Sequence, residues 1–205
     1  MRSIVALLML GLLALATGNE AFARPRPRPL TGTGLVQIVP LDRSRPLEPL
    51  VLYRDPGLGR VAELPLSRLP GLEPVFANLS GQGRAVVTRQ HGEWLRIIYD
   101  QADREGWLRG DRFWSYTPWP LFLKGRVIRL LPGLKKGYGV LRTEAAETAP
   151  VLAPLSPDLG LRVVQVSGDW AMVIAGISQA GWLRWRDADG RFLVGIDSRF
   201  DPQNH

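Results

Sequence analysis

The sequence predicts an all-β protein built from two small β-barrels in tandem. The first reason is a repeat, because residues 91–109 read HGEWLRIIYDQADREGWLR and residues 167–184 read SGDWAMVIAGISQAGWLR. Such self-similarity indicates a duplicated supersecondary unit. The second reason is that 17 prolines and 22 glycines separate short runs of Leu, Val and Ile, which is typical of many short strands. The third is the lack of a convincing helix, since the nearest candidate, 144–149, is short and is closed by Pro150.

A secretory signal peptide is predicted at residues 1–23. Arg2 gives a basic start, an apolar run covers 4–16, and Ala21-Phe22-Ala23 has the small-x-small pattern that precedes cleavage. The apolar run is shorter than the roughly 20 residues of a membrane-spanning helix, and no second such run follows. We therefore expect a soluble protein that is cut after Ala23 and exported to the periplasm or secreted.

Five parts are predicted after the signal. They are a leader at 24–45, a first barrel at 46–116, an aromatic connector at 117–136, a second barrel at 137–197 and a tail at 198–205. The leader opens with RPRPRPL at 24–30. Because proline-rich sequence is stiff and poor in N–H donors, we expect a cationic spacer that joins no sheet. The alternative is a proline-rich ligand motif.

Each copy of the repeat predicts a three-stranded meander. The strands of the first copy are expected at 86–87, 94–99 and 106–109, with turns at 91–92 and 100–103. Those of the second are expected at 163–164, 170–175 and 181–185, with turns at 167–169 and 176–178. The stretches are rich in β-branched and aromatic residues, and the turns contain Gly, Asp and Ser. Gly106 and Gly181 each precede a tryptophan, where the missing side chain allows another strand to approach closely.

The repeated residues resemble the bacterial SH3-like (SH3b) domains, whose signature is a turn, a Trp, a hydrophobic residue three positions later and a Gly-Trp-hydrophobic step. Two openings resemble the family's short first strand, at 52–56 and 140–143. From Arg54 to Trp94 is 40 positions and from Arg142 to Trp170 is 28, so about a dozen extra residues are expected in the first copy around 66–78. The resemblance implies non-enzymatic binding modules that recognise cell-wall peptides or other envelope proteins. The residues that carry the signature are Trp94, Ile97, Gly106, Trp107 and Leu108 in the first copy, and Trp170, Val173, Gly181, Trp182 and Leu183 in the second.

Six residues are predicted to form the structural core of the repeat, namely Trp94, Ile97, Gly106, Trp170, Val173 and Gly181. The candidate ligand-binding residues are Trp107, Arg109, Trp182 and Arg184. An aromatic wall beside a guanidinium can hold a peptide carboxylate. The alternative for both arginines is a simple ion pair with a nearby acid such as Asp111 or Asp187.

The connector contains FWSYTPWPLF at 113–122, in which five of ten residues are aromatic. Such density favours burial between the two barrels. If the stretch is exposed instead, it offers a patch for a sugar or a partner protein.

Composition argues against an enzyme. The chain has no cysteine, which excludes disulfides, cysteine zinc sites and a cysteine nucleophile. Its only histidines are His91, in a predicted turn, and His205, and no nucleophile elbow accompanies them. Asp187 and Asp189 can in principle act as acid and base or bind calcium, but Asp-x-Asp-Gly favours a hairpin turn. We expect no metal and no cofactor.

The formal net charge is +7, which favours anionic partners unless arginine is simply common in this chain. We therefore expect a non-catalytic binding or scaffolding module of the bacterial cell envelope, whose partner is an envelope protein, a peptidoglycan peptide or an anionic polymer. The alternative is a basic nucleic-acid or polyanion binder, whose affinity falls steeply with salt. A hydrolase without a recognisable motif is a third class.

Overall fold

The computed structural model describes residues 28–39, 48–73, 75–76, 83–177 and 179–196. The predicted signal peptide at 1–23, the first residues of the leader and the predicted tail at 198–205 lie outside the described residues. Within the described residues, no helix is long and apolar enough to cross a membrane.

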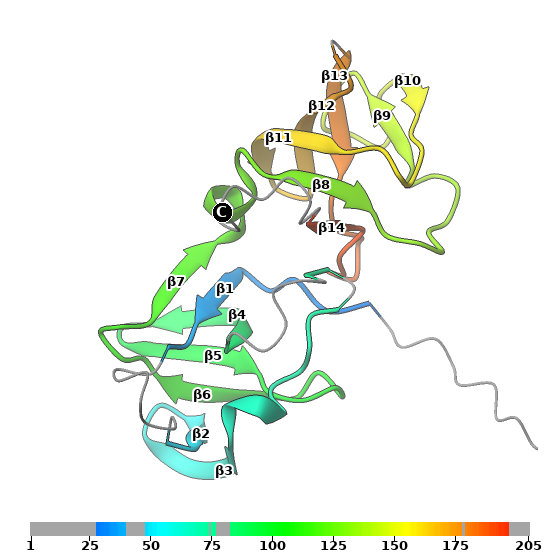
Figure 1. Cartoon of the computed structure of the whole chain (residues 1–205). Helices are drawn as coiled ribbons and strands as arrows, with labels where there is room; N and C mark the ends of the chain where they lie inside the picture. Colours follow the sequence, from blue (N-terminus) through cyan, green and yellow to red (C-terminus); the bar gives the residue numbers. More distant parts are fainter. Residues whose placement is uncertain (1–27, 40–47, 74, 77–82, 178, 197–205) are drawn as a thin grey trace, which may run out of the picture.

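The prediction of an all-β protein is confirmed, because the described residues form two separate antiparallel sheets of seven strands each. Figure 1 shows the first sheet in the lower half of the view and the second in the upper half. The first sheet contains β1 (Gly34–Gln37), β2 (Leu50–Asp55), β3 (Leu58–Leu64), β4 (Arg84–His91), β5 (Trp94–Ile98), β6 (Glu105–Arg109) and β7 (Ser115–Pro118). The second contains β8 (Val127–Leu130), β9 (Val140–Arg142), β10 (Val151–Pro154), β11 (Leu161–Ser167), β12 (Trp170–Ala175), β13 (Gln179–Arg184) and β14 (Val194–Ile196).

The two sheets have the same topology. Their strand orders are β3-β2-β6-β5-β4-β1-β7 and β10-β9-β13-β12-β11-β8-β14, so each strand of the second takes the place of the strand seven earlier. The irregularities also coincide. The β4–β5 register shifts between 87 and 89, and the β11–β12 register shifts between 163 and 165. The duplication predicted from the short repeat therefore extends over both sheets. We call each sheet, together with the loops that join its strands, a module, so that the first module contains β1 to β7 and the second contains β8 to β14.

The sheets begin earlier than the predicted barrels at 46–116 and 137–197. Strand β1 lies within the predicted leader, and β8 lies within the predicted connector. The expected extra residues of the first copy are present where they were predicted, because the loop from β3 to β4 covers 65–83 whereas the loop from β10 to β11 covers only 155–160.

The prediction that the leader joins no sheet is wrong for its described part. Leu30 forms an antiparallel bridge with Arg191, and the backbone N–H of Phe192 donates to the carbonyl of Pro29 at 3.1 Å. A proline lacks the N–H donor but keeps its carbonyl acceptor. One-sided pairing of this kind therefore needs no proline N–H, and the leader segment around Pro29 and Leu30 is held against residues 190–192.

Helical structure is limited to two short turns in the described residues. One is the 3-10 helix η1 (Leu66–Arg68), and the other is α1 (Trp119–Leu123). The sequence did not predict α1. Pro120 lies in its first turn, where a missing N–H costs no intrahelical hydrogen bond. The weak helix candidate at 144–149 forms bends and turns.

The aromatic connector is buried between the modules at its centre. Trp119 is 1% exposed, and its ring stacks on Phe76 of the β3–β4 loop and meets Phe192 of the second module edge to face. The same buried cluster includes Leu35 of β1. The core of the second module therefore extends through Trp119 to Leu35 and Phe76, whereas the strands of the first module enclose a separate core cluster. Phe113 at the start of the stretch is 42% exposed.

The predicted turn at 100–103 is organised by the carboxylate of Asp100. Its Oδ1 accepts the backbone N–H groups of Ala102 and Arg104, both at 3.0 Å, and its Oδ2 accepts from Arg104 Nε at 2.5 Å. Partial burial raises the pKa of this carboxyl, but the hydrogen bonds and the positive charge of Arg104 outweigh it. The pKa of Asp100 therefore lies below its ordinary value of 3.8.

The lowered pKa of Asp100 makes the free energy of unfolding depend on pH. A carboxyl whose folded pKa is lowered contributes its full stabilisation above its ordinary pKa and loses it as pH falls through the lower folded pKa. We expect wild type to be more stable than Asp100→Asn at neutral pH, and the difference to shrink below about pH 4. Urea unfolding of both proteins across that range measures it, and a difference that is independent of pH would contradict the assignment.

Candidate functional site

Each module presents the same tryptophan-arginine pair on the outer face of its sheet. Trp94 of β5 lies opposite Arg109 of β6, and Trp170 of β12 lies opposite Arg184 of β13. The residues next to these in each strand are buried, among them Leu95 and Leu183. Because side chains alternate between faces along a strand, the pairs point away from the core. The two arginines named by the repeat therefore occupy equivalent positions.

Two of the predicted core residues do not belong to the core. Trp94 and Trp170 are half-buried on the outer face, and Trp94 meets Tyr53 edge to face at 5.6 Å between ring centres. Ile97 and Val173, both fully buried, confirm the prediction for their positions. The tryptophans point outward because each lies three positions before a buried residue of the same strand. Side chains alternate between the two faces of a strand, so residues at an odd spacing face opposite sides.

The two glycines of the repeat are tightly packed, as predicted. A Cβ built on Gly181 would lie 2.6 Å from Leu141 Cγ, and one built on Gly106 would lie 3.1 Å from Leu52 Cβ. Each glycine thus allows the neighbouring strand, β9 or β2, to approach β13 or β6. This approach brings Arg142 of β9 opposite Trp182.

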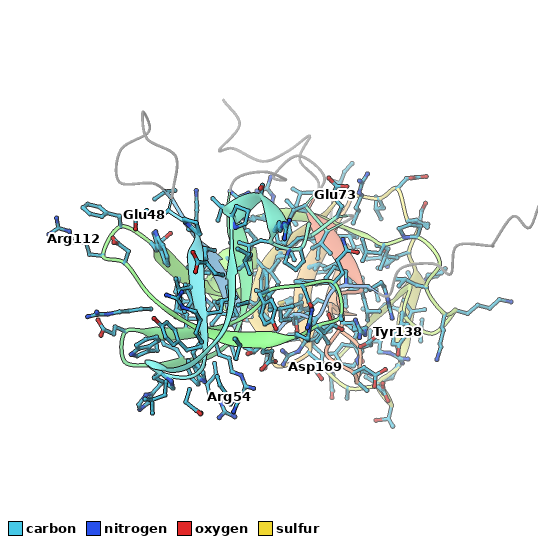
Figure 2. The ribbon with its side chains drawn as sticks, turned by 90° about the horizontal axis from the view of Figure 1, so that it is seen from below. Glu48, Arg54, Glu73, Arg112, Tyr138 and Asp169 are labelled. Carbon is cyan, nitrogen blue, oxygen red and sulfur yellow. The ribbon has the colours of Figure 1, made fainter. Side chains whose placement is uncertain are left out.

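The outer face of the second module is hollowed into a pocket of about 310 Å³. Trp170 and Tyr138 supply aromatic surface, and Arg142 and Arg184 supply positive charge. Its remaining lining residues are Gly137, Val140 and Glu147. Tyr138 is labelled in Figure 2. The pocket combines an aromatic wall with two guanidinium groups, which is the arrangement that recognises a planar anionic group.

Arg184 is held in place on several sides. Its side chain is 13% exposed and forms an ion pair with Glu147. A second, longer contact of 3.9 Å runs from Nη2 to Asp169, which Figure 2 also labels. Nε donates to the carbonyl of Arg186 at 3.1 Å, and the guanidinium carbon lies 5.9 Å from the centre of the Trp170 ring. The group is therefore oriented in advance, which lowers the entropy cost of binding.

Arg142 is oriented by the loop that follows β9. Its Nη1 donates to the carbonyl of Ala149 at 2.6 Å. That loop covers 143–150, whereas the equivalent connection of the first module, from β2 to β3, is the two-residue turn Pro56-Gly57. In the first module the position of Arg142 is taken by Tyr53, since both lie opposite the second tryptophan of their repeat. The modules share a fold but differ where the pocket forms.

The other candidate residues have different surroundings. Trp107 is 7% exposed, which leaves little of its ring for a ligand. Trp182 is half-buried and is not among the lining residues of the pocket. Arg109 is 67% exposed and pairs with Glu93 at 3.0 Å. Both arginines thus form ion pairs with nearby acids, which was the alternative considered for them. The partner of Arg109 is Glu93 and those of Arg184 are Glu147 and Asp169, in place of the suggested Asp111 and Asp187.

The structure adds three pocket residues that the repeat did not single out as ligand-binding, Tyr138, Arg142 and Trp170. The outward position of Trp170 could have been inferred from its equivalent in the first copy, Trp94. Arg96 lies two positions after Trp94 and therefore on the same face of the strand. A charged residue at that spacing indicates an outward face. Tyr138 and Glu147 lie outside the repeated stretch, so the repeat carried no signal for them.

Asp187 and Asp189 form the predicted turn. Oδ1 of Asp187 accepts the backbone N–H groups of Asp189 at 3.1 Å and Arg191 at 2.9 Å, and Oδ2 pairs with Arg28 at 2.6 Å. Within the part of the chain that the structure describes, no group of three or more His, Cys, Asp or Glu side chains is placed to hold a metal ion. His91 is exposed at the end of β4.

A scan against protein-family models found no match for this chain, and a search of the curated proteins found no significant one.

Proposed function

We propose that this chain is an exported, non-catalytic binding or scaffolding protein of the bacterial cell envelope, made of two SH3-like modules. The pocket of Trp170, Tyr138, Arg142 and Arg184 carries the proposal. Export rests on the predicted signal peptide at 1–23. Binding without catalysis is favoured because the pocket offers aromatic surface and fixed cations and has Glu147 as its single carboxylate.

The pocket favours a ligand with a terminal carboxylate next to a small apolar group. Its volume of about 310 Å³ suits a small group and not a bulky one. The guanidinium groups of Arg142 and Arg184 can donate to the two oxygens of one carboxylate. Trp170 and Val140 provide the apolar contact. Peptides of the cell wall and the C-termini of envelope proteins both present this chemistry.

Binding through this pocket predicts a difference between the two equivalent arginines. We expect Arg184→Ala to weaken binding of N-acetyl-D-alanyl-D-alanine by about 1.5–3 kcal/mol, the usual worth of a charge-assisted hydrogen bond. The matched variant Arg109→Ala removes the same side chain from the first module and should bind like wild type. Titration followed by the NMR signal of the Trp170 indole N–H measures the affinity.

Two further measurements make this test decisive. The C-terminal amide of the same probe should bind much more weakly than the acid, since it offers no carboxylate. Circular dichroism should show that both variants remain folded. Equal binding by Arg184→Ala and wild type would refute the pocket, and equal binding of acid and amide would refute carboxylate recognition.

A further inference from the structure

A second hollow of about 500 Å³ lies where the first sheet meets the segment after β7, and it shares no lining residue with the aromatic pocket. One wall comes from β1, β4 and β7, and the other comes from α1 and the residues that follow it. We call it the connector groove. Its lining residues are Leu35, Gln37, Arg84, Ser115, Thr117, Leu121, Phe122, Lys124, Gly125 and Arg126.

The register of three neighbouring strands builds the first wall. Gln37 of β1 lies opposite Ser115 of β7 on one side and opposite Arg84 of β4 on the other. Residues that are direct partners point to the same face of a sheet. A hydroxyl, an amide and a guanidinium therefore form one row across the sheet, and Thr117 adds a second hydroxyl two residues along β7.

The second wall contributes two more cations. Arg126 is fixed by its neighbour Phe122, because its Nε donates to the Phe122 carbonyl at 2.9 Å and its guanidinium carbon lies 4.4 Å from the centre of the Phe122 ring. Lys124 is exposed directly after α1. The three cations thus come from two separate parts of the chain, Arg84 from β4 and Lys124 and Arg126 from the connector.

The chemistry of the lining selects for an oxyanion. The lining contains three cationic side chains, two hydroxyls and one amide. Phosphate has several acceptor oxygens and takes hydrogen bonds from arginine, lysine and hydroxyl groups together. The apolar floor of Leu35 and Phe122 strengthens these contacts because it lowers the local dielectric constant.

We propose that the connector groove is a binding site for a phosphate-bearing ligand. This site is separate from the aromatic pocket of the second module and does not depend on it. A volume of about 500 Å³ accommodates more than one phosphate group. The net charge of +7 would then have a specific use, since it draws polyanions toward the surface on which the groove opens.

A matched pair of charge reversals tests the site. Lys124→Glu and Lys135→Glu change the net charge equally, and both lysines are exposed, but only Lys124 lines the groove. We expect Lys124→Glu to weaken binding of inorganic tripolyphosphate at least about tenfold, and Lys135→Glu to change it by no more than about twofold. Isothermal titration at low salt measures both, and the backbone N–H signals of Thr117 and Gly125 should shift on binding.

A second probe, a single-stranded DNA of 12 nucleotides, separates the sources of the phosphate. Binding of both probes with the same dependence on Lys124 supports recognition of the phosphate group itself. Binding of the DNA alone, with that dependence, supports a polymeric ligand with the groove as its contact. Equal losses in the two variants would show a general charge effect and overturn the site, and so would a wild type that binds neither probe.

Discussion

Replacement of Trp119 by alanine is expected to lower the free energy of unfolding by about 3–5 kcal/mol, the range seen when a buried tryptophan or phenylalanine is truncated. Trp119 is 1% exposed and its ring contacts Phe76, Phe122, Trp185 and Phe192. These rings come from both modules and the connector, so no single element can move to fill the cavity. Its Nε1 also donates to the carbonyl of Thr31 at 2.5 Å, and the variant leaves that acceptor without its partner.

Phe113→Ala is the control for this variant. Phe113 belongs to the same aromatic stretch but is 42% exposed, so its truncation should cost less than about 1 kcal/mol. Denaturation by urea, followed by tryptophan fluorescence and by circular dichroism, measures both variants. Because Trp119 packs where the modules meet, its loss should also separate the transitions of the two probes. A cost below about 1 kcal/mol for Trp119→Ala would show that the modules do not depend on this contact.

The strands of the repeat were predictable because their sequence is locally informative. The expected strand at 170–175 coincides with β12, and the other expected strands lie within or overlap β4, β5, β6, β11 and β13. Each is bounded by a turn with glycine or aspartate, and each contains residues that favour the extended conformation. The longer loop of the first copy was also located from spacing alone.

The first strand of each module was not predictable in this way. Residues 34–37 follow a proline-rich segment and residues 127–130 follow the aromatic stretch, and neither carries a motif shared with the other. These strands form because β4 and β11 each expose an unpaired edge that β1 and β8 complete. That pairing is a property of the folded sheet, which local sequence does not encode.

The pocket was predictable only in part, because its residues meet through the fold. The predicted candidate Arg184 lines the pocket together with Trp170, whereas the predicted aromatic candidate Trp182 is not among the lining residues. In the second copy, Trp170, Ala171, Met172 and Val173 are all apolar, so a period of two cannot show which face is buried. Arg142 and Tyr138 reach the pocket from β9 and the loop before it. Their approach follows from the packing of β9 against Gly181.

The second large effect is expected at Asp187, which joins the leader to the second module. Its side chain is 5% exposed. Its Oδ1 accepts two backbone N–H groups of the turn, and its Oδ2 forms an ion pair with Arg28. We expect Asp187→Ala to cost about 2–4 kcal/mol, because it leaves two backbone donors and a partly buried guanidinium without their acceptor. Thermal and urea unfolding measure the loss.

Two companion variants divide this cost between the turn and the ion pair. Asp187→Asn keeps an oxygen for the N–H groups of Asp189 and Arg191 but removes the charge opposite Arg28, so its cost should lie between that of Asp187→Ala and zero. Asp189→Ala changes an exposed residue of the same turn and should cost no more than about 0.5 kcal/mol. If Asp187→Asn is as stable as wild type, the ion pair with Arg28 contributes nothing and the turn alone explains the burial of Asp187. If Asp189→Ala costs as much as Asp187→Ala, the loss of stability comes from the turn sequence and not from the buried carboxylate. In that case the leader is held by its backbone pairing with residues 190–192.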